Sequence, residues 1–305
     1  MDRHLRLGTR GSPLALYQAN LVAAELSRAH EELRIDIEVV RTTGDRIQDR
    51  TLAELGGKGL FAKEIEEKLL SGGLDLAVHS MKDMETELPT GLRIAAILPR
   101  EDPRDAFLSR SGEGLDALPD GARIGTASVR RRAQLLHRRP DLEVVPLRGN
   151  VETRLRKLQD GEVDATLLAL AGLRRLEQEG VVTEVLDMDR MLPAAAQGAI
   201  GAEIRTDDDD LAALLAAIDD EDASACVSAE RALLAALDGT CHTPIGAFAA
   251  LDGAAGTLSL QGLVARPDGS ELHRREDTAP LADANEMATA MGQALRAEMG
   301  PGFFQ

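Results

Sequence analysis

The sequence predicts an α/β protein with two similar lobes, followed by a small C-terminal α+β domain. Three observations support this fold class. Strand-like and helix-like segments alternate through the first two-thirds of the chain, which is typical of largely parallel sheets. A short pattern of segments occurs twice within that region, and beyond Thr206 the order of elements changes.

The strand-like segments of the first two-thirds are short apolar runs bounded by turn residues. We expect strands at residues 5–7, 35–40, 74–78, 92–97, 123–125, 142–146 and 164–169. The helix-like segments repeat apolar residues at intervals of three and four positions. We expect helices at residues 12–30, 58–71, 128–138 and 151–159.

The repeated pattern consists of a strand, the dipeptide Gly-Thr and a serine at the expected start of a helix. That serine is Ser12 in the first copy and Ser128 in the second. Later in each copy, a helix and a glycine precede an acidic strand start, at Asp75 and Asp164. The amides and the dipole of a helix start favour anions. Two such lobes would present anion-binding helix starts on both sides of a cleft.

The last third of the chain has the pattern of a separate α+β domain. The run Asp207-Asp208-Asp209-Asp210 precedes a helix at 211–218 and is ordinary helix capping, not a metal site. A second helix is expected at 223–237. Strands at 245–251, 257–265 and 271–276 follow, joined by glycine-containing turns, and a final helix spans 282–298.

Composition limits the classes of partner. The chain has 305 residues, a net charge of -17, no Trp, one Tyr and five Phe, which disfavours binding to nucleic acid or to anionic membranes. The longest apolar runs fall short of a bilayer span, and a strand begins too early for a signal peptide. Two cysteines do not make a secreted disulfide framework, so we expect a cytoplasmic location.

A basic segment interrupts this acidic chain. Between Arg123 and Arg156 there are nine arginines and three acidic residues. The segment is either a solvated basic face or a site for an anionic ligand, because guanidinium groups match the geometry of carboxylates.

A second candidate site is the run Asp75-Leu76-Ala77-Val78-His79-Ser80-Met81-Lys82-Asp83, which lies earlier in the chain and includes a strand expected to be buried. Residues directly after such a strand lie at the edge where α/β folds bind ligands. Lys82 and Asp83 are either a surface ion pair or a ligand-binding ammonium beside a proton-transferring carboxylate. His79 is expected to be structural rather than catalytic. The glycine-rich run Gly56-Gly57-Lys58-Gly59 lacks the spacing of a nucleotide phosphate loop and indicates a lid or hinge.

The two cysteines differ in their surroundings. Cys226 lies within an apolar helical segment and is expected to be a core residue. Cys241 lies in a loop before Pro244, where neither a protease signature nor a zinc-ligand spacing surrounds it. The residues alone identify Cys241 only as the more exposed thiol.

Taken together and in order, these motifs resemble those of the hydroxymethylbilane synthase (porphobilinogen deaminase) family along essentially the whole chain. The matching stretches are Thr9-Arg10-Gly11-Ser12-Pro13-Leu14-Ala15-Leu16, Thr43-Gly44-Asp45, Gly56-Gly57-Lys58-Gly59-Leu60-Phe61, Ala77-Val78-His79-Ser80-Met81-Lys82-Asp83, Arg100-Glu101-Asp102-Pro103-Arg104-Asp105-Ala106-Phe107, Leu147-Arg148-Gly149-Asn150-Val151 with Thr153-Arg154, Gln197-Gly198-Ala199 and Cys241-His242-Thr243-Pro244-Ile245-Gly246.

The resemblance implies two periplasmic-binding-protein-like lobes of type II plus a small C-terminal α+β domain. The implied boundaries are 1–98 with 199–217 for a discontinuous first lobe, 104–192 for the second lobe, and 221–305 for the domain that carries Cys241.

The resemblance also implies a transferase of tetrapyrrole (heme) biosynthesis. Such an enzyme condenses four porphobilinogen molecules stepwise, with loss of ammonia, into linear hydroxymethylbilane. The primer would be a dipyrromethane cofactor attached through a thioether to Cys241. The family's other properties imply a monomer that uses no metal.

The resemblance also assigns site residues, position by position. Asp83 matches the catalytic carboxylate, and Lys58 and Phe61 match the lid or hinge. The residues that match the family's cofactor and substrate ligands are Arg10, Ser12, Lys82, Thr126, Ser128, Arg130, Arg131, Arg148, Arg154, Arg175 and Gln197. The chain departs from the common family pattern at Glu54, Met84-Glu85, Ala127 and His242.

Two other functions fit the sequence less well. A two-lobed ligand-binding receptor or sensor would bring a secretory signal or a DNA-binding motif, and it would have no use for an anchored cysteine. Nucleic-acid binding through Arg130-Arg131-Arg132 is disfavoured by the net charge and by the scarcity of aromatic residues.

Overall fold

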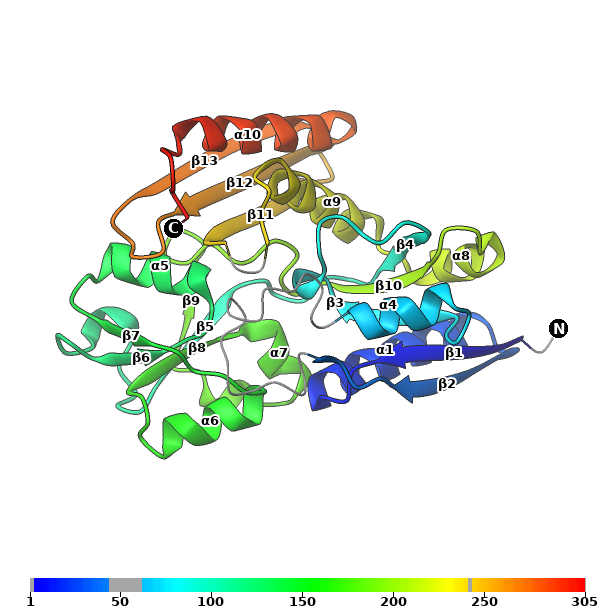
Figure 1. The fold of residues 1–305 in the computed structure, drawn as a ribbon, viewed down its shortest axis with the longest axis horizontal. Helices are drawn as coiled ribbons and strands as arrows, with labels where there is room; N and C mark the ends of the chain where they lie inside the picture. Colours follow the sequence, from blue (N-terminus) through cyan, green and yellow to red (C-terminus); the bar gives the residue numbers. More distant parts are fainter. Residues whose placement is uncertain (1–2, 44–61, 241–242, 305) are drawn as a thin grey trace. The chain divides into compact units, whose positions relative to one another are not determined.

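The computed structural model of the chain describes residues 3–43, 62–240 and 243–304 (Figure 1). The chain divides into two compact units. Unit 1 consists of Met1–Glu101 and Ala199–Ser224, and unit 2 consists of Asp102–Gly198 and Ala225–Gln305. The first unit is therefore discontinuous in sequence, and the chain leaves it and returns to it once.

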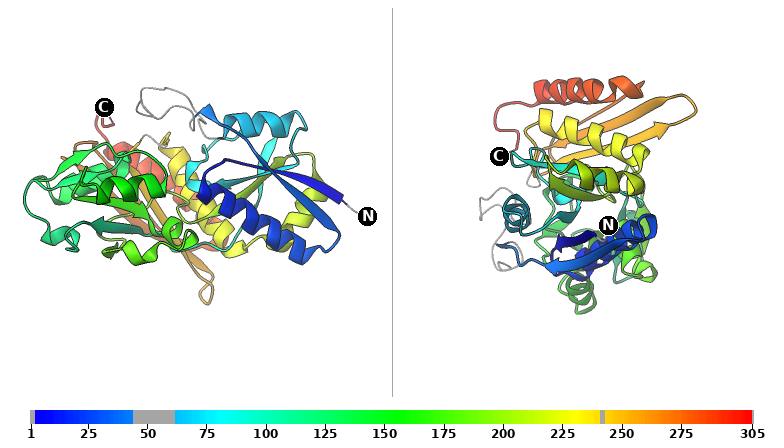
Figure 2. Two further views of the ribbon diagram at one scale, coloured as in Figure 1. Left: turned by 90° about the horizontal axis from the view of Figure 1, so that it is seen from below. Right: turned by 90° about the vertical axis from the view of Figure 1, so that its right-hand side faces the viewer.

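Unit 1 is built on a five-stranded sheet with the strand order β2-β1-β3-β10-β4. Its elements are β1 (Arg3–Thr9), α1 (Pro13–Ala29), β2 (Leu33–Val39), α4 (Lys63–Leu70), β3 (Leu76–Ser80), the short helix η1 (Met81–Asp83), β4 (Leu92–Ile97), β10 (Ile200–Arg205) and α8 (Asp209–Leu215). Helices α1 and α4 lie on opposite sides of this sheet (Figure 2).

Unit 2 begins with a second five-stranded sheet, in the order β7-β6-β8-β5-β9. Its elements are β5 (Asp105–Ser109), β6 (Arg123–Gly125), α5 (Val129–Arg138), β7 (Glu143–Val145), α6 (Val151–Gln159), β8 (Ala165–Ala169), α7 (Leu170–Arg175) and β9 (Glu184–Leu186). Leu135 of α5 packs in one core cluster and Leu155 and Leu158 of α6 pack in another.

The two five-stranded sheets share one topology. Strand β1 pairs in parallel with β2 and β3, as β6 pairs with β7 and β8. Strand β10 is antiparallel to both of its neighbours, as β5 is in the other sheet. The duplication inferred from the sequence is therefore present in the strand order. Each sheet is mixed, however, and the expectation of largely parallel sheets missed the antiparallel strand.

The acidic strand starts have the same role in both copies. Oδ2 of Asp75 accepts a hydrogen bond from the backbone amide of Arg6 at 2.8 Å, and Oδ2 of Asp164 accepts one from the amide of Arg123 at 2.8 Å. Each carboxylate thus ties the start of one strand to its parallel neighbour. The pattern is a structural device, since each side chain satisfies a backbone donor at the sheet edge.

The C-terminal part of unit 2 is a three-stranded antiparallel sheet in the order β11-β12-β13. Its elements are α9 (Glu221–Ala236), β11 (Ile245–Asp252), β12 (Thr257–Ala265), β13 (Leu272–Pro280) and α10 (Ala284–Glu298). Glycine at position 292 lets the two helices approach closely, because a Cβ atom there would lie 2.9 Å from the carbonyl oxygen of Leu233. The expected elements of this domain are confirmed to within a few residues.

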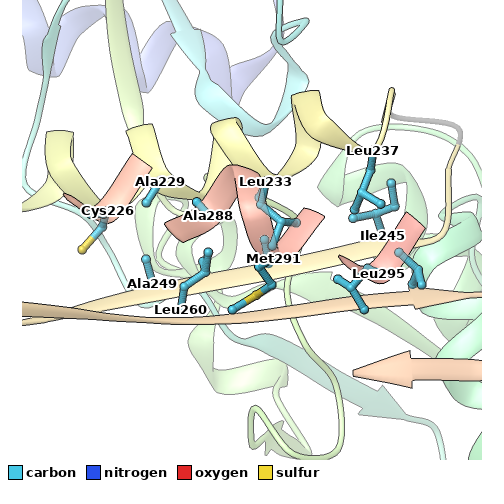
Figure 3. Close-up of a cluster of buried hydrophobic side chains, with 14 of the residues drawn as sticks. Cys226, Ala229, Leu233, Leu237, Ile245, Ala249, Leu260, Ala288, Met291 and Leu295 are labelled. Carbon is cyan, nitrogen blue, oxygen red and sulfur yellow. The ribbon is translucent and has the colours of Figure 1, made fainter. Parts of the chain in front are cut away.

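Side chains from α9, α10, β11 and β12 form one core cluster (Figure 3). Cys226 belongs to it and is 7% exposed, which confirms the expectation that this cysteine is a core residue. A further cluster joins Ala133 of α5 to Leu263 and Ala265 of β12. This packing explains why the second five-stranded sheet and the C-terminal sheet fall in one compact unit. The three-domain division expected from the sequence stays a prediction.

Some expected boundaries shift. The helix expected at 58–71 is described from Lys63, and residues 58–61 lie outside the described part of the chain. Across 3–43, 62–240 and 243–304, every helix is too short or too polar to cross a bilayer.

Candidate functional site

Polar side chains gather where the parallel strands of unit 1 end. Arg10 and Ser12 follow β1, and Lys82 and Asp83 follow β3. Strands β1 and β3 are parallel neighbours, so their carboxyl ends lie at one edge of the sheet. These four residues belong to two motifs that are far apart in the sequence. The fold brings them to one edge of the sheet, as expected for a site.

A pocket lies at this edge, and we call it the Asp83 pocket. It is lined by Arg10, Ser12, Leu14, Ala15, Gln18, Ala62, Val78, His79, Ser80, Asp83 and Met84. The side chain of Ser12 caps α1 by accepting a hydrogen bond from the amide of Ala15 at 3.2 Å. The amide nitrogen of Gln18 donates to Oγ of Ser80 at 2.8 Å and ties α1 to the end of β3.

The turn that carries Lys82 and Asp83 is anchored by its first residue. Met81 is buried, and its amide donates to the carbonyl of Ala199 at 3.1 Å. The position paired with this region on β10 is Gly201, where an added Cβ would lie 2.1 Å from the Met81 sulfur. Asp83 is exposed on the pocket wall, while Lys82 is half-buried. The rigid turn thus presents a carboxylate to the pocket.

Met84 and Glu85, where the sequence departs from the expected family pattern, both lie close to the Asp83 pocket or act on groups near it. Met84 is buried and lines the Asp83 pocket, so an apolar side chain forms part of its wall. Glu85 is half-buried, and its negative charge acts on Glu66 of α4.

Three buried titratable groups lie between α4 and the sheet, next to this pocket: Glu66 on the helix, and His79 and Glu203 on the strands. Nε2 of His79 lies 2.9 Å from Oε2 of Glu203 on β10, and both side chains are buried. Burial, together with the charge of Glu203, raises the pKa of Glu66 to about 7. The expectation that His79 is held in the core is consistent with its burial. Glu203 and Glu66 were missed, and the only signal for Glu203 was a carboxylate within the apolar run Ile200-Gly201-Ala202-Glu203-Ile204.

Unit 2 repeats the arrangement at the carboxyl ends of β6, β7 and β8. Oγ1 of Thr126 accepts a hydrogen bond from the amide of Ser128 at 3.1 Å. Oγ of Ser128 accepts one from the amide of Arg131 at 3.4 Å and caps α5. Ala127, one of the positions expected to depart from the family pattern, is exposed between them. Ser12 and Ser128 are equivalent caps in the two copies.

Arg130 and Arg131 converge on one buried carboxylate. Nη2 of Arg130 donates to Oδ2 of Asp105 at 2.8 Å, and Nη2 of Arg131 donates to Oδ1 at 2.7 Å. Nε2 of Gln197 donates to the same Oδ1 at 2.8 Å. Burial alone would raise the pKa of Asp105, but the charges of Arg130 and Arg131 outweigh it and hold that pKa well below its usual range.

Asp105 is 0% exposed and both guanidinium groups are nearly as buried. Each arginine also donates to a backbone carbonyl, Arg130 to Leu192 and Arg131 to Leu167. The structure thus gives these two expected ligand residues an internal partner. Asp105 lies within one of the sequence motifs but was not expected in the site, although a charged residue at the start of an apolar strand was a signal.

The other arginines of the expected site surround the start of α6 and the end of α7. Nε of Arg154 donates to the carbonyl of Gly149 at 2.8 Å, and Nη2 of Arg175 donates to that of Gly198 at 2.6 Å. Gly149 has φ +123°, and a Cβ atom there would lie 2.7 Å from that of Thr153, so the position requires glycine. Nη1 of Arg148 is buried without a hydrogen-bond partner among the described residues.

Several expected site residues fall outside the described part of the chain: Cys241, Lys58 and Phe61, together with the departures Glu54 and His242. The residues that flank the cysteine are held to each other. Oγ1 of Thr243 donates to the carbonyl of Thr240 at 2.7 Å and accepts from its amide at 2.9 Å. Within 3–43, 62–240 and 243–304, no group of three or more His, Cys, Asp or Glu could hold a metal ion.

Comparison with known proteins gives consistent matches. Residues 5–213 match the family model "Porphobilinogen deaminase, dipyromethane cofactor binding domain", and residues 224–300 match "Porphobilinogen deaminase, C-terminal domain". The porphobilinogen deaminase of Paracoccus denitrificans is 52% identical over 98% of this chain and 96% of that protein. The chloroplastic porphobilinogen deaminase of rice is 50% identical over 98% of this chain and 85% of that protein.

Solved structures with a similar arrangement include binding proteins. The methionine binding protein MetQ matches with a TM-score of 0.45 at 13% identity, over 70% of this chain and 88% of MetQ. The VFT2 domain of Bordetella pertussis BvgS matches with a TM-score of 0.43 at 16% identity, over 70% of this chain and 85% of that domain.

Proposed function

The chain belongs to the porphobilinogen deaminase family, and from that premise we propose how its own residues carry out the family's reaction. It is an enzyme of tetrapyrrole biosynthesis with porphobilinogen deaminase activity and a dipyrromethane cofactor-binding domain. The overall reaction we propose is the stepwise condensation of four porphobilinogen molecules, with loss of ammonia, into linear hydroxymethylbilane.

The position of Asp83 is the observation that carries this proposal. Its carboxylate stands exposed on the wall of a pocket that Arg10 also lines, on a turn fixed by the buried Met81. A substrate that bears carboxylates and loses an amine needs both kinds of group. A cation binds its carboxylates, and an anion stabilises the positive charge that develops as ammonia leaves.

We assign to Asp83 the stabilisation of that developing cation. A carboxylate at this position lowers the energy of a positively charged transition state more than that of the neutral ground state, which is the condition for catalysis. It also accepts a hydrogen bond from a pyrrole N–H and orients the ring. Lys82, next to it on the same turn, binds a substrate carboxylate.

The residues present fit a dipyrromethane cofactor. Each pyrrole ring carries an acetate and a propionate side chain, so the group is a polyanion. Arg148 offers a guanidinium nitrogen that is buried and unpaired within the described residues, which is the state expected of a ligand donor. Ser12 and Ser128 place two helix starts at the strand ends of their respective units.

The residues that would hold the cofactor and the growing chain are Arg10, Ser12, Lys82, Thr126, Ser128, Arg130, Arg131, Arg148, Arg154, Arg175 and Gln197. When bound, the group supplies the pyrrole carbon to which the first substrate is joined. The side chains of the protein bind its carboxylates, orient its rings and keep the charges of successive rings neutralised.

We infer that Cys241 anchors the cofactor through a thioether. The only other cysteine, Cys226, is buried in the core of the C-terminal domain and is unsuited to carry a polyanion. A carbon–sulfur bond survives repeated proton transfers, so the primer would stay attached through every cycle. Lys58 and Phe61 would then act in a lid or hinge.

We further propose a monomer that works in the cytoplasm, without metal, nucleic acid or membrane as partner. Its domains would be 1–98 with 199–217, 104–192 and 221–305. The separate core clusters of unit 1, of the second five-stranded sheet and of the C-terminal sheet support this division.

The experiment that tests the proposed reaction is a turnover assay with porphobilinogen as sole substrate. We expect four ammonia molecules to be released for each linear tetrapyrrole formed. Consumption of no porphobilinogen by protein that carries the cofactor would overturn the proposal.

A further inference from the structure

The buried group formed by His79, Glu203 and Glu66 is unusual for a structural core. Glu203 is 0% exposed, His79 is 7% exposed, and Glu66 is also buried. Burying carboxylates costs free energy unless they are paired and hydrogen-bonded. Oε1 of Glu203 is nonetheless buried without a hydrogen-bond partner among the described residues. A core selected for stability alone would not keep this arrangement.

The three side chains lie on one face of the sheet. His79 pairs with Gly201, and Glu203 pairs with Ala77, across the antiparallel strands β3 and β10. Ala77 packs with Ile65 and Leu69 of α4, so this face lies under that helix. Glu66 belongs to the same helix. The histidine and the two carboxylates therefore form one cluster between the sheet and α4.

The cluster connects with the Asp83 pocket through His79, which lines it. A histidine whose one ring nitrogen is held by a buried carboxylate has a fixed orientation. Asp83 lies four positions further along the chain, on the turn that follows β3. The proposed catalytic carboxylate and the His79–Glu203 pair thus share one pocket.

The charged groups that act on the cluster come from each element around it. Burial and the negative charge of Glu203 raise the pKa of Glu66, whereas His79 lowers it. Glu67 on α4 and Glu85 after η1 raise it further, and the outcome is a pKa of about 7. The carboxyl group of Glu66 therefore gains and loses its proton near neutral pH.

We propose that His79, Glu203 and Glu66 form a proton store for the Asp83 pocket, with Glu203 as the positioning residue that holds His79. This rests on the proposed function. In each cycle the cluster gives a proton to the aminomethyl nitrogen of the incoming substrate, the C–N bond breaks and ammonia leaves, and a C–C bond to the previous ring forms. The C–H bond at the attacked ring carbon then breaks, and the cluster takes up that proton and holds it for the amine of the next substrate.

The test uses the cofactor-loaded enzyme and measures kcat and KM for porphobilinogen between pH 6 and 9. Glu203→Gln keeps the size and a hydrogen-bond acceptor for His79 but cannot hold a proton. We expect it to lower kcat by about 10- to 100-fold while KM changes by less than about 3-fold. A purely structural role would lower kcat equally at every pH and leave the shape of the profile unchanged, and that result would overturn the proposal.

Glu66→Gln is the second variant, and it decides the question if Glu203→Gln does not fold. It should remove an ionisation near pH 7 from the kcat profile. The matched control is Glu113→Gln, an exposed glutamate of unit 2 outside the cluster, which should leave the profile unchanged. A wild-type profile for Glu66→Gln would refute the proton store. Failure of the wild-type enzyme to make the tetrapyrrole would instead count against the proposed function.

Discussion

Nη2 of Arg130 lies 2.8 Å from Oδ2 of Asp105, and both side chains are almost completely buried. The other oxygen of Asp105, Oδ1, accepts hydrogen bonds from Arg131 and Gln197. One carboxylate at the start of β5 therefore fixes two arginines at the start of α5. We call Asp105, Arg130, Arg131 and Gln197 the Asp105 array. This array depends on Asp105 more than on any of its partners.

Replacing Asp105 with alanine should strongly destabilise the protein, because two buried guanidinium groups would lose their counter-charge. We expect a loss of about 3–5 kcal/mol in the free energy of unfolding, measured by urea denaturation. Asp120→Ala is the control, since that side chain is 99% exposed and should change stability by less than about 0.5 kcal/mol. Equal effects of the two changes would show that the Asp105 array contributes little to the fold.

Asp83→Asn should abolish most turnover while leaving the cofactor bound. The amide keeps the shape of the side chain but loses the charge that stabilises the developing cation. We expect kcat to fall by about 10²- to 10⁴-fold, with the melting temperature unchanged because Asp83 is exposed. Steady-state kinetics on protein of verified cofactor content measure this. Turnover close to that of the wild type would remove Asp83 from the mechanism.

Stability should depend on pH through Glu66. Its pKa in the folded protein is about 7, above the ordinary value of 4.5. The folded state therefore holds the proton more tightly than the unfolded chain. The resulting stabilisation is complete below pH 4.5 and is lost as the pH rises through 7.

Glu66→Gln removes this dependence. Between pH 5 and pH 8 the wild type should lose about 1–3 kcal/mol of unfolding free energy. The variant should not show this loss. Urea denaturation at the two pH values measures the difference, with Glu113→Gln as the exposed control. A constant difference between variant and wild type across this range would contradict the raised pKa.

Arg148→Leu should impair ligand binding without harming the fold. Nη1 of Arg148 is buried and lacks a hydrogen-bond partner among the described residues, so its removal relieves an unpaired donor. We expect unchanged or slightly higher stability, together with incomplete cofactor assembly or enzyme–substrate complexes that stall early. Native mass spectrometry of the complexes reports this, and Arg132→Leu, an exposed neighbour of the array, is the control. Normal elongation by Arg148→Leu would place this residue outside the site.

Much of the fold was readable from local patterns. Ser12 and Ser128 cap the helices that they were expected to begin, and Asp75 and Asp164 mark equivalent strand starts. These features are local because a cap or a strand start is specified by adjacent residues. Apolar periodicity was sufficient for the elements of the C-terminal domain.

The antiparallel strands β5 and β10 were missed for a physical reason. Each contains a buried charged residue, Asp105 or Glu203, that breaks the apolar pattern of a central strand. The partners of these carboxylates are distant in sequence, at Arg130 for the first and His79 for the second. Only the folded chain brings them together, so no local pattern could reveal either cluster.

The central claim is that Cys241 carries a covalent dipyrromethane, and the intact mass of the purified protein tests it most directly. We predict an excess over the sequence mass that corresponds to two porphobilinogen-derived rings, located on Cys241 by peptide mapping. The excess should be absent from Cys241→Ser and retained in Cys226→Ala. An unmodified mass for the active wild-type enzyme, or an excess that persists in Cys241→Ser, would contradict the account.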